Sequence, residues 1–135
     1  MALRLIDSSV WVDYLRGKDT KARYRMRELA EQSDLLATTE PIVMELRSGA
    51  NDAALTQIEQ VLGGLVQLGI DPAIDFSQAA DLARAVRRTG HTVRSAMDCL
   101  IASVALRRDA ILVHKDVDFE RIGAVAPRLR LESIR

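Results

Sequence analysis

Short apolar runs alternate along this chain with longer segments whose apolar residues recur at helical spacing, and this alternation limits the possible folds most strongly. Strands are predicted at residues 3–6, 35–38, 65–70, 110–113 and 129–131. Helices are predicted from Ser9 to Gly17, at 20–32, from 39 or 40 to 49, at 52–62, at 75–88, and from Ser95 past Leu106. Short strands joined by helices require a mostly parallel sheet with helices on both faces. The predicted fold class is therefore α/β.

Length and composition indicate one domain covering residues 1–135. The 19 basic and 19 acidic side chains balance, which argues against a strongly basic platform for nucleic acid. No apolar run approaches the ~20 residues of a membrane span, and the first residues lack a signal-peptide pattern. Because Cys99 is the only cysteine, it cannot form an internal disulfide, and a cytoplasmic location is expected.

Acidic residues gather where a parallel sheet would place a site. Asp7 directly follows the first predicted strand, and Asp116 and Asp118 follow the fourth. Glu45 and Asp98 lie among apolar neighbours on predicted helices. Ligands bind beyond the carboxyl ends of parallel strands, and converging buried carboxylates require neutralisation. Oxygen ligands without a Cys/His set favour Mg²⁺ or Mn²⁺, which supports phosphoryl chemistry.

Each acid also has an ordinary structural interpretation. An Asx turn or a cap on the first helix would account for Asp7, and a solvated helix charge would account for Glu45. Asp98 would then only complete a capping box favoured by the helix dipole, and Asp116 and Asp118 would be turn residues. Their occurrence together, in this order, favours the metal site.

Four sequence blocks carry a resemblance to a known family. They are LIDSSVW at 5–11, EPIVMEL at 40–46 with Gly49, DCLIA at 98–102, and HKDVDF at 114–119. In this order and spacing they closely resemble the PIN-domain ribonucleases, and among these the VapC toxins of bacterial toxin–antitoxin modules. The resemblance covers essentially the whole chain. It implies a three-layer α/β/α fold with a central sheet of about five strands in order 3-2-1-4-5, and Mg²⁺- or Mn²⁺-dependent endonucleolytic cleavage of RNA.

The resemblance also implies roles for individual residues. Asp7, Glu45 and Asp98 match the family's first three acidic positions, and either Asp116 or Asp118 matches the fourth. Asp116 is favoured as the residue nearer the metal, so that Asp7, Asp98 and Asp116 would hold the ion. Glu45 would position or deprotonate the attacking water. Asp118 and Ser9 would support the site.

Partners follow from the same resemblance. VapC toxins usually form homodimers, and a small VapB-type antitoxin silences them and binds promoter DNA, so DNA contact would be indirect. The expected substrate is a structured RNA, either transfer or ribosomal, whose cleavage inhibits translation, and no membrane partner is expected.

Basic residues and histidines complete the candidates. Arg84, Arg87, Arg88 and Arg94 surround the break at Gly90, where they would contact RNA phosphates or form a solvated helix face. The two histidines, His91 and His114, are not at metal-ligand spacing and are predicted to be surface or turn residues.

Three competing functions fit the residues less well. A phosphoacceptor signalling domain needs paired acids after the first strand, but Asp7 is followed by two serines, and Asp71 has no acidic partner nearby. A phosphohydrolase with an aspartyl nucleophile needs a second acid where Ser9 stands. A PIN domain that binds RNA without cutting it is disfavoured by the complete acidic set.

Overall fold

A five-stranded parallel sheet organises the computed structural model, which describes residues 2–17, 20–31 and 35–135. The strands are β1 (Leu3–Ile6), β2 (Leu35–Thr38), β3 (Val66–Gln67), β4 (Ile111–His114) and β5 (Arg130–Ser133). Their order is β3-β2-β1-β4-β5, and every neighbouring pair is parallel. Strands β1 and β4 lie inside the sheet, and their mainly apolar residues suit strands that are covered on both faces. The predicted α/β class and strand order are confirmed.

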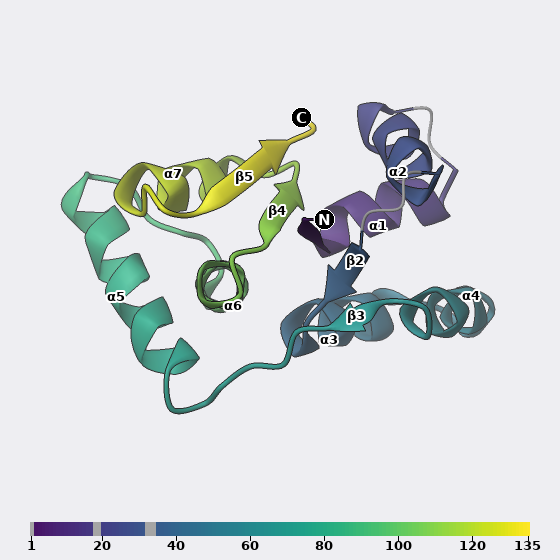
Figure 1. Ribbon diagram of the computed structural model, residues 1–135, viewed down its shortest axis with the longest axis horizontal. Helices are drawn as coiled ribbons and strands as arrows, with labels where there is room; N and C mark the ends of the chain where they lie inside the picture. The colour runs from purple at the N-terminus through teal and green to yellow at the C-terminus, as the bar shows by residue number, and fades with distance from the viewer. Residues whose placement is uncertain (1, 18–19, 32–34) are drawn as a thin grey trace.

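Seven helices accompany the sheet within the described residues. They are α1 (Ser8–Leu15), α2 (Lys21–Glu31), α3 (Glu40–Gly49), α4 (Asp52–Leu62), α5 (Asp75–Arg88), α6 (Ala96–Arg107) and α7 (Val117–Val125). In Figure 1, α5, α6 and α7 lie to the left of β4, and α1 and α2 lie to its right. The sheet is therefore covered by helices from distant parts of the sequence.

The core is formed by the central strands and by α6. Leu5, Ile6, Leu112 and Val113 in β1 and β4 have no exposed surface. Helix α6 is buried continuously from Cys99 to Ala105, so it packs as an interior helix rather than an amphipathic surface one. This apolar support fixes the positions of the strand ends and of the α6 N-terminus.

Helix N-caps explain why the chain turns from strand to helix so abruptly. Asp7 caps α1 by accepting a hydrogen bond from the Ser9 amide, and Asp116 caps α7 by accepting one from the Asp118 amide. Ser95 likewise caps α6. An N-cap side chain satisfies amides that the first turn leaves unpaired. Both aspartates are thereby fixed at the carboxyl edge of the sheet.

Differences from the predicted elements are local. Helix α7 was not predicted, although Asp116 as a cap and Phe119 and Ile122 at helical spacing signal it. The third strand is shorter than the predicted 65–70, because it forms ladder pairs only at Val66 and Gln67. The end of the second predicted helix, near Gln32, falls at a position the structure does not describe.

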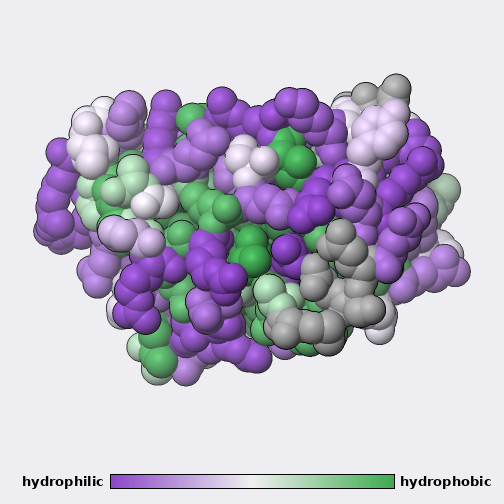
Figure 2. Space-filling view, turned by 45° about the horizontal axis from the view of Figure 1, so that its top comes forward, coloured by the Kyte–Doolittle hydropathy of each residue, from purple (hydrophilic) through white to green (hydrophobic). Residues whose placement is uncertain are grey.

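Figure 2 shows one face of the molecule as mostly hydrophilic, with smaller apolar areas between the polar side chains. The large apolar side chains that are exposed in the described residues are Tyr24, Leu35, Met44, Ile74 and Phe76. Among the described helices none has both the length and the apolar character that crossing a membrane requires.

Candidate active site

Strand pairing brings two of the predicted acids to one edge. Because β1 pairs directly with β4, with Ile6 opposite Val113, the chain leaves both strands at the same level of the sheet. The Asp7 amide then donates to the Val113 carbonyl over 3.0 Å, which extends the pairing to the predicted site residue. Asp7 and Asp116 thus arise at neighbouring strand ends, as the sequence predicts.

Asp7 is a buried carboxylate held by Ser9. Its Oδ2 accepts hydrogen bonds from the Ser9 hydroxyl at 2.6 Å and the Ser9 amide at 3.2 Å, and the residue is only 5% exposed. Burial raises the pKa of Asp7 above its ordinary value, although the Ser9 hydrogen bonds oppose the rise. The Ser9 hydroxyl therefore orients Asp7 and stabilises its charged form.

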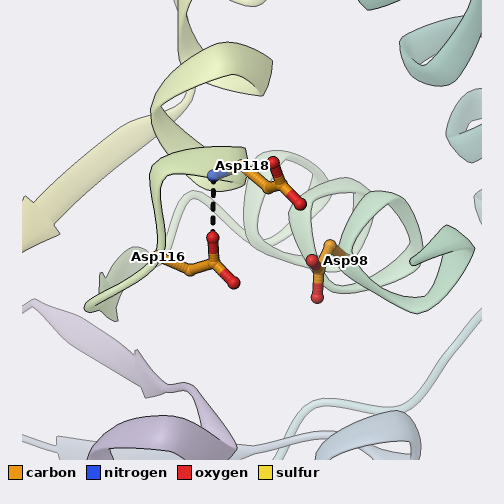
Figure 3. Close-up of side chains that lie close together, drawn as sticks. All are labelled: Asp98, Asp116 and Asp118. Atoms are coloured by element: carbon orange, nitrogen blue, oxygen red, sulfur yellow. Dashed lines mark hydrogen bonds between the residues drawn. The ribbon is translucent and has the colours of Figure 1, made fainter. Parts of the chain in front are cut away.

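Three further aspartates lie close together. Asp98 projects from the first turn of α6, Asp116 caps α7, and Asp118 lies in the first turn of α7 (Figure 3). One carboxylate oxygen from each lies within 4.8 Å of the others. Asp116 Oδ1 also accepts from the Asp118 amide at 2.9 Å, which is the dashed line in Figure 3. Asp98, Asp116 and Asp118 are named the acidic cluster below.

The electrostatics of Asp98 connect this cluster to the remaining acids. Burial is the main cause that raises its pKa to about 7, and the charges of Asp7, Asp116, Glu45 and Asp118 raise it further, in that order. All five predicted acids therefore act on the same region of space. Asp7 and Glu45 do not belong to the acidic cluster, but their charges raise the pKa of Asp98, which does.

Glu45 reaches this region from α3. Its pKa is raised by burial and by the charge of Asp7, while a hydrogen bond with Ser8 opposes the shift. One carboxylate oxygen, Oε1, is buried and has no hydrogen-bond partner among the described residues. A buried carboxylate oxygen without a donor is costly, so Glu45 is suited to face a water or a cation.

Asp118 differs from its neighbours because two arginines neutralise it. Its Oδ2 accepts from the Arg94 amide at 3.1 Å and from Arg94 Nε at 3.0 Å, and its Oδ1 accepts from Arg121 Nη1 at 3.2 Å. Burial would raise the pKa of this fully buried carboxyl, but hydrogen bonds and charge from Arg94, together with the Arg121 charge, lower it overall. Asp118 is therefore a structural anion within the cluster.

The arginines around Gly90 separate into two groups. Arg94 binds Asp116 as well as Asp118, with Nη2 at 2.8 Å and 3.0 Å from the two Asp116 oxygens. Arg84, Arg87 and Arg88 are exposed on α5, and none of them forms an ion pair with another described residue. The sequence placed all four near the site, but no signal in it distinguished Arg94 from the others.

Two neighbours of the cluster were not recognised as site residues from the sequence. The prediction that His114 is a surface or turn residue is wrong, because it ends β4 and is fully buried, with its ring 5.3 Å from Phe119. Its Nδ1 accepts from the Asp116 amide at 3.1 Å, so it orients that residue. Lys115 forms an ion pair with Asp13 that ties α1 to the loop before α7. His91 is exposed, as predicted.

The donor set fits a hard divalent cation. The candidate ligands that converge here are all carboxylates, and carboxylate oxygens are preferred ligands of Mg²⁺ and Mn²⁺. The charges of four neighbouring acids disfavour the ionised form of Asp98, and a bound cation would relieve this repulsion. Asp7 and Asp98 offer carboxylate oxygens that no arginine contacts in the described part of the chain, whereas Arg94 contacts both oxygens of Asp116, and Arg94 and Arg121 contact those of Asp118.

Comparisons with known proteins agree with this geometry. Residues 4–125 match the PIN domain family. A VapC ribonuclease of Mycobacterium bovis is 46% identical over 123 residues, which are 90% of this chain and 92% of that protein. A DNA-bound VapBC structure from Salmonella typhimurium superposes with a TM-score of 0.77 at 22% identity, over the full length of both chains. VapBC-5 from Mycobacterium tuberculosis, of the VapBC family of toxin–antitoxin systems, has a TM-score of 0.65 at 25% identity, over 100% of this chain and 99% of that chain.

Proposed function

The chain belongs to the PIN domain family, among its VapC ribonucleases, and from this premise we propose that it is a Mg²⁺- or Mn²⁺-dependent endoribonuclease. As a single PIN domain covering residues 1–135, it would act as the toxin of a VapBC toxin–antitoxin system. Its substrate would be a structured RNA, transfer or ribosomal, and its cleavage would inhibit translation. The observation that carries this proposal is the convergence of five carboxylates on one edge of the sheet.

Within this proposal Asp7, Asp98 and Asp116 hold the cation. Such an ion supplies a more acidic bound water and stabilises charge that develops on the phosphate. The residues around it fix the geometry: the Ser9 hydroxyl orients Asp7, and the Asp118 amide and His114 orient Asp116. Asp118 balances the nearby arginines and completes the support of the site.

Glu45 is the group that we propose to position the attacking water and accept its proton. Its raised pKa makes it a stronger base than an ordinary glutamate, and its buried Oε1 is free of other donors among the described residues. Attack by this water in line with the 3′ oxygen of the phosphodiester leaves a 5′-phosphate and a 3′-hydroxyl. The exposed Arg84, Arg87 and Arg88 are proposed as contacts for RNA phosphates outside the reacting group.

A VapB-type antitoxin is the proposed partner. VapBC complexes are among the proteins of similar fold, and at least two of them are bound to DNA, which supports an indirect link to DNA through the antitoxin. In this chain a groove of about 310 Å³ runs between α1, α3 and α4. Val12, Leu15, Leu46 and Ile58 line it, and so does Glu45. An apolar segment of the antitoxin bound in this groove would lie close to Glu45. The form of the toxin that the antitoxin silences would be a homodimer.

Cleavage of cellular RNA tests the proposed activity. Total bacterial RNA is incubated with the purified protein and Mg²⁺, and new 5′ ends are mapped by sequencing. We expect cuts at few positions in transfer or ribosomal RNA, abolished by EDTA and restored by Mn²⁺. Asp98→Asn should lower the rate by at least about a hundredfold, because it removes both a ligand and a charge.

The matched control is Asp81→Asn, which makes the same chemical change at an exposed position of α5. This variant should cleave at the rate of the unaltered protein. Full activity of Asp98→Asn, or cleavage that persists in EDTA, would exclude the proposed mechanism.

A further inference from the structure

The position of Arg94 is not explained by the proposed reaction. Arg94 lies in the connection between α5 and α6, and its side chain is 71% exposed. Nevertheless its guanidinium spans two members of the acidic cluster, with Nε on Asp118 and Nη2 on Asp116. Because the side chain is largely in solvent, these carboxylates rather than packing hold it in place.

The two carboxylates depend on Arg94 to different degrees. Asp118 keeps other donors if the guanidinium leaves, namely the Arg94 amide and Arg121. Asp116 Oδ1 keeps the Asp118 amide. For Asp116 Oδ2, however, Arg94 Nη2 at 3.0 Å is the only hydrogen-bond donor found in the described residues. The guanidinium therefore occupies the Asp116 oxygen that is otherwise free to bind a cation.

We propose that Arg94 is an intramolecular counter-ion that competes with the divalent cation for Asp116. The inference rests on the proposed function, in which Asp116 is a ligand of that cation. In the metal-free protein Arg94 neutralises the cluster. When the cation binds, Nη2 leaves Asp116, while the Arg94 amide stays on Asp118. Arg94 thereby sets the cation concentration at which the site fills.

The chemistry of arginine makes this exchange a displacement rather than a titration. A guanidinium stays charged at any physiological pH, so it cannot yield the site by losing a proton. A cation on the same carboxylate is repelled by it, and the two occupy Asp116 alternately. An exposed ion pair is weak, so the displacement is reversible at moderate cation concentration.

Arg121 offers a matched control within the same cluster. It has the same charge and also binds Asp118, at 3.2 Å, but in the described residues it forms no hydrogen bond or ion pair with Asp116. General loss of positive charge should therefore affect Arg94→Gln and Arg121→Gln alike. Competition for Asp116 should affect only Arg94→Gln.

Calorimetric titration of the EDTA-treated full chain with Mn²⁺ tests the inference. We expect Arg94→Gln to lower the Mn²⁺ dissociation constant by about three- to fivefold, the upper part of the range for one exposed ion pair. Arg121→Gln should change it by less than about twofold. A merely structural Arg94 would give unchanged or weaker binding in Arg94→Gln, and that result would overturn the inference while leaving the proposed function intact. Absence of Mn²⁺ binding in all three proteins would overturn both.

A second measurement on the unaltered protein does not depend on how any variant folds. During a Mg²⁺ titration followed by nitrogen-15 NMR, the side-chain Nε–H resonance of Arg94 should shift with the same midpoint as binding, and that of Arg121 should stay nearly constant. An unchanged Arg94 resonance at saturating Mg²⁺ would contradict displacement.

Discussion

The ionised side chain of Asp98 lowers the free energy of unfolding of the metal-free protein. Asp98 has its pKa raised to about 7 by burial and by four neighbouring acids. In the unfolded chain the same carboxyl ionises near its ordinary value of 3.8. Its ionisation therefore favours the unfolded chain, and the penalty to folding develops as the pH rises from about 4 to about 7.

Asp98→Asn should therefore stabilise the metal-free protein. Three pKa units correspond to about 4 kcal/mol, and partial exposure reduces this, so we expect a gain of about 2 kcal/mol in unfolding free energy at pH 8. The gain should diminish as the pH falls below 7 and vanish near pH 4. Denaturant unfolding in EDTA at pH 8 and pH 5 measures it, with Asp81→Asn as the control. If Asp98→Asn were less stable than the unaltered protein at pH 8, the ionised Asp98 would not be destabilising the metal-free protein.

The sequence identified the acids but not their counter-ions. Asp7 and Asp116 cap helices just after apolar strands, and Asp98 lies in the first turn of a helix, so their places in the fold could be predicted from the local pattern. Arg94 could not be assigned to Asp116 and Asp118, because residues 94 and 116 meet only through tertiary packing. His114 was misjudged for a similar reason: a polar residue at a strand end is usually exposed, and here Phe119 and the sheet cover it.

Helices α5 and α6 are joined by a buried polar contact, which helps to hold the helix that carries Asp98. Asp75, at the start of α5, is fully buried and accepts from Ser103 Oγ at 2.8 Å and Arg107 Nη2 at 2.8 Å. Burial would raise the pKa of Asp75, but the Arg107 hydrogen bonds lead the causes that lower it overall. The contact fixes α6, whose first turn carries Asp98.

Asp75→Ala should lower the unfolding free energy by about 3 kcal/mol, because it leaves a partly buried guanidinium without its carboxylate. The control is Glu59→Ala, which breaks the exposed Arg47–Glu59 pair and should cost less than about 1 kcal/mol. Urea denaturation compares the two variants. Equal, small losses would show that the buried pair contributes no more than the surface pair.

Element boundaries could be predicted where apolar residues recur clearly at helical spacing, as in α3, α4 and α5. Boundaries could not be predicted where they depend on contacts between segments that are distant in the sequence. The third strand is limited by how far β2 runs alongside it, and α7 is a short helix whose nine residues gave a weak periodic signal.

At the scale of the whole molecule, the order of the strands determines which acids meet at one edge of the sheet. Placing β1 beside β4 joins residues about a hundred positions apart, so that Asp7 and Asp116 leave neighbouring strands. Helices α3 and α6 then bring Glu45 and Asp98 to the same edge. The order itself was implied by the family resemblance, because apolar patterns alone indicate a parallel sheet but not which strands pair.

Anomalous X-ray scattering from crystals of the protein equilibrated with Mn²⁺ tests the shared cation site most directly. We expect the strongest manganese peak to lie between the carboxylates of Asp7, Asp98 and Asp116, and to be lost in crystals of Asp98→Asn. A manganese peak away from these three residues, or no peak at saturating Mn²⁺, would show that they do not share a cation.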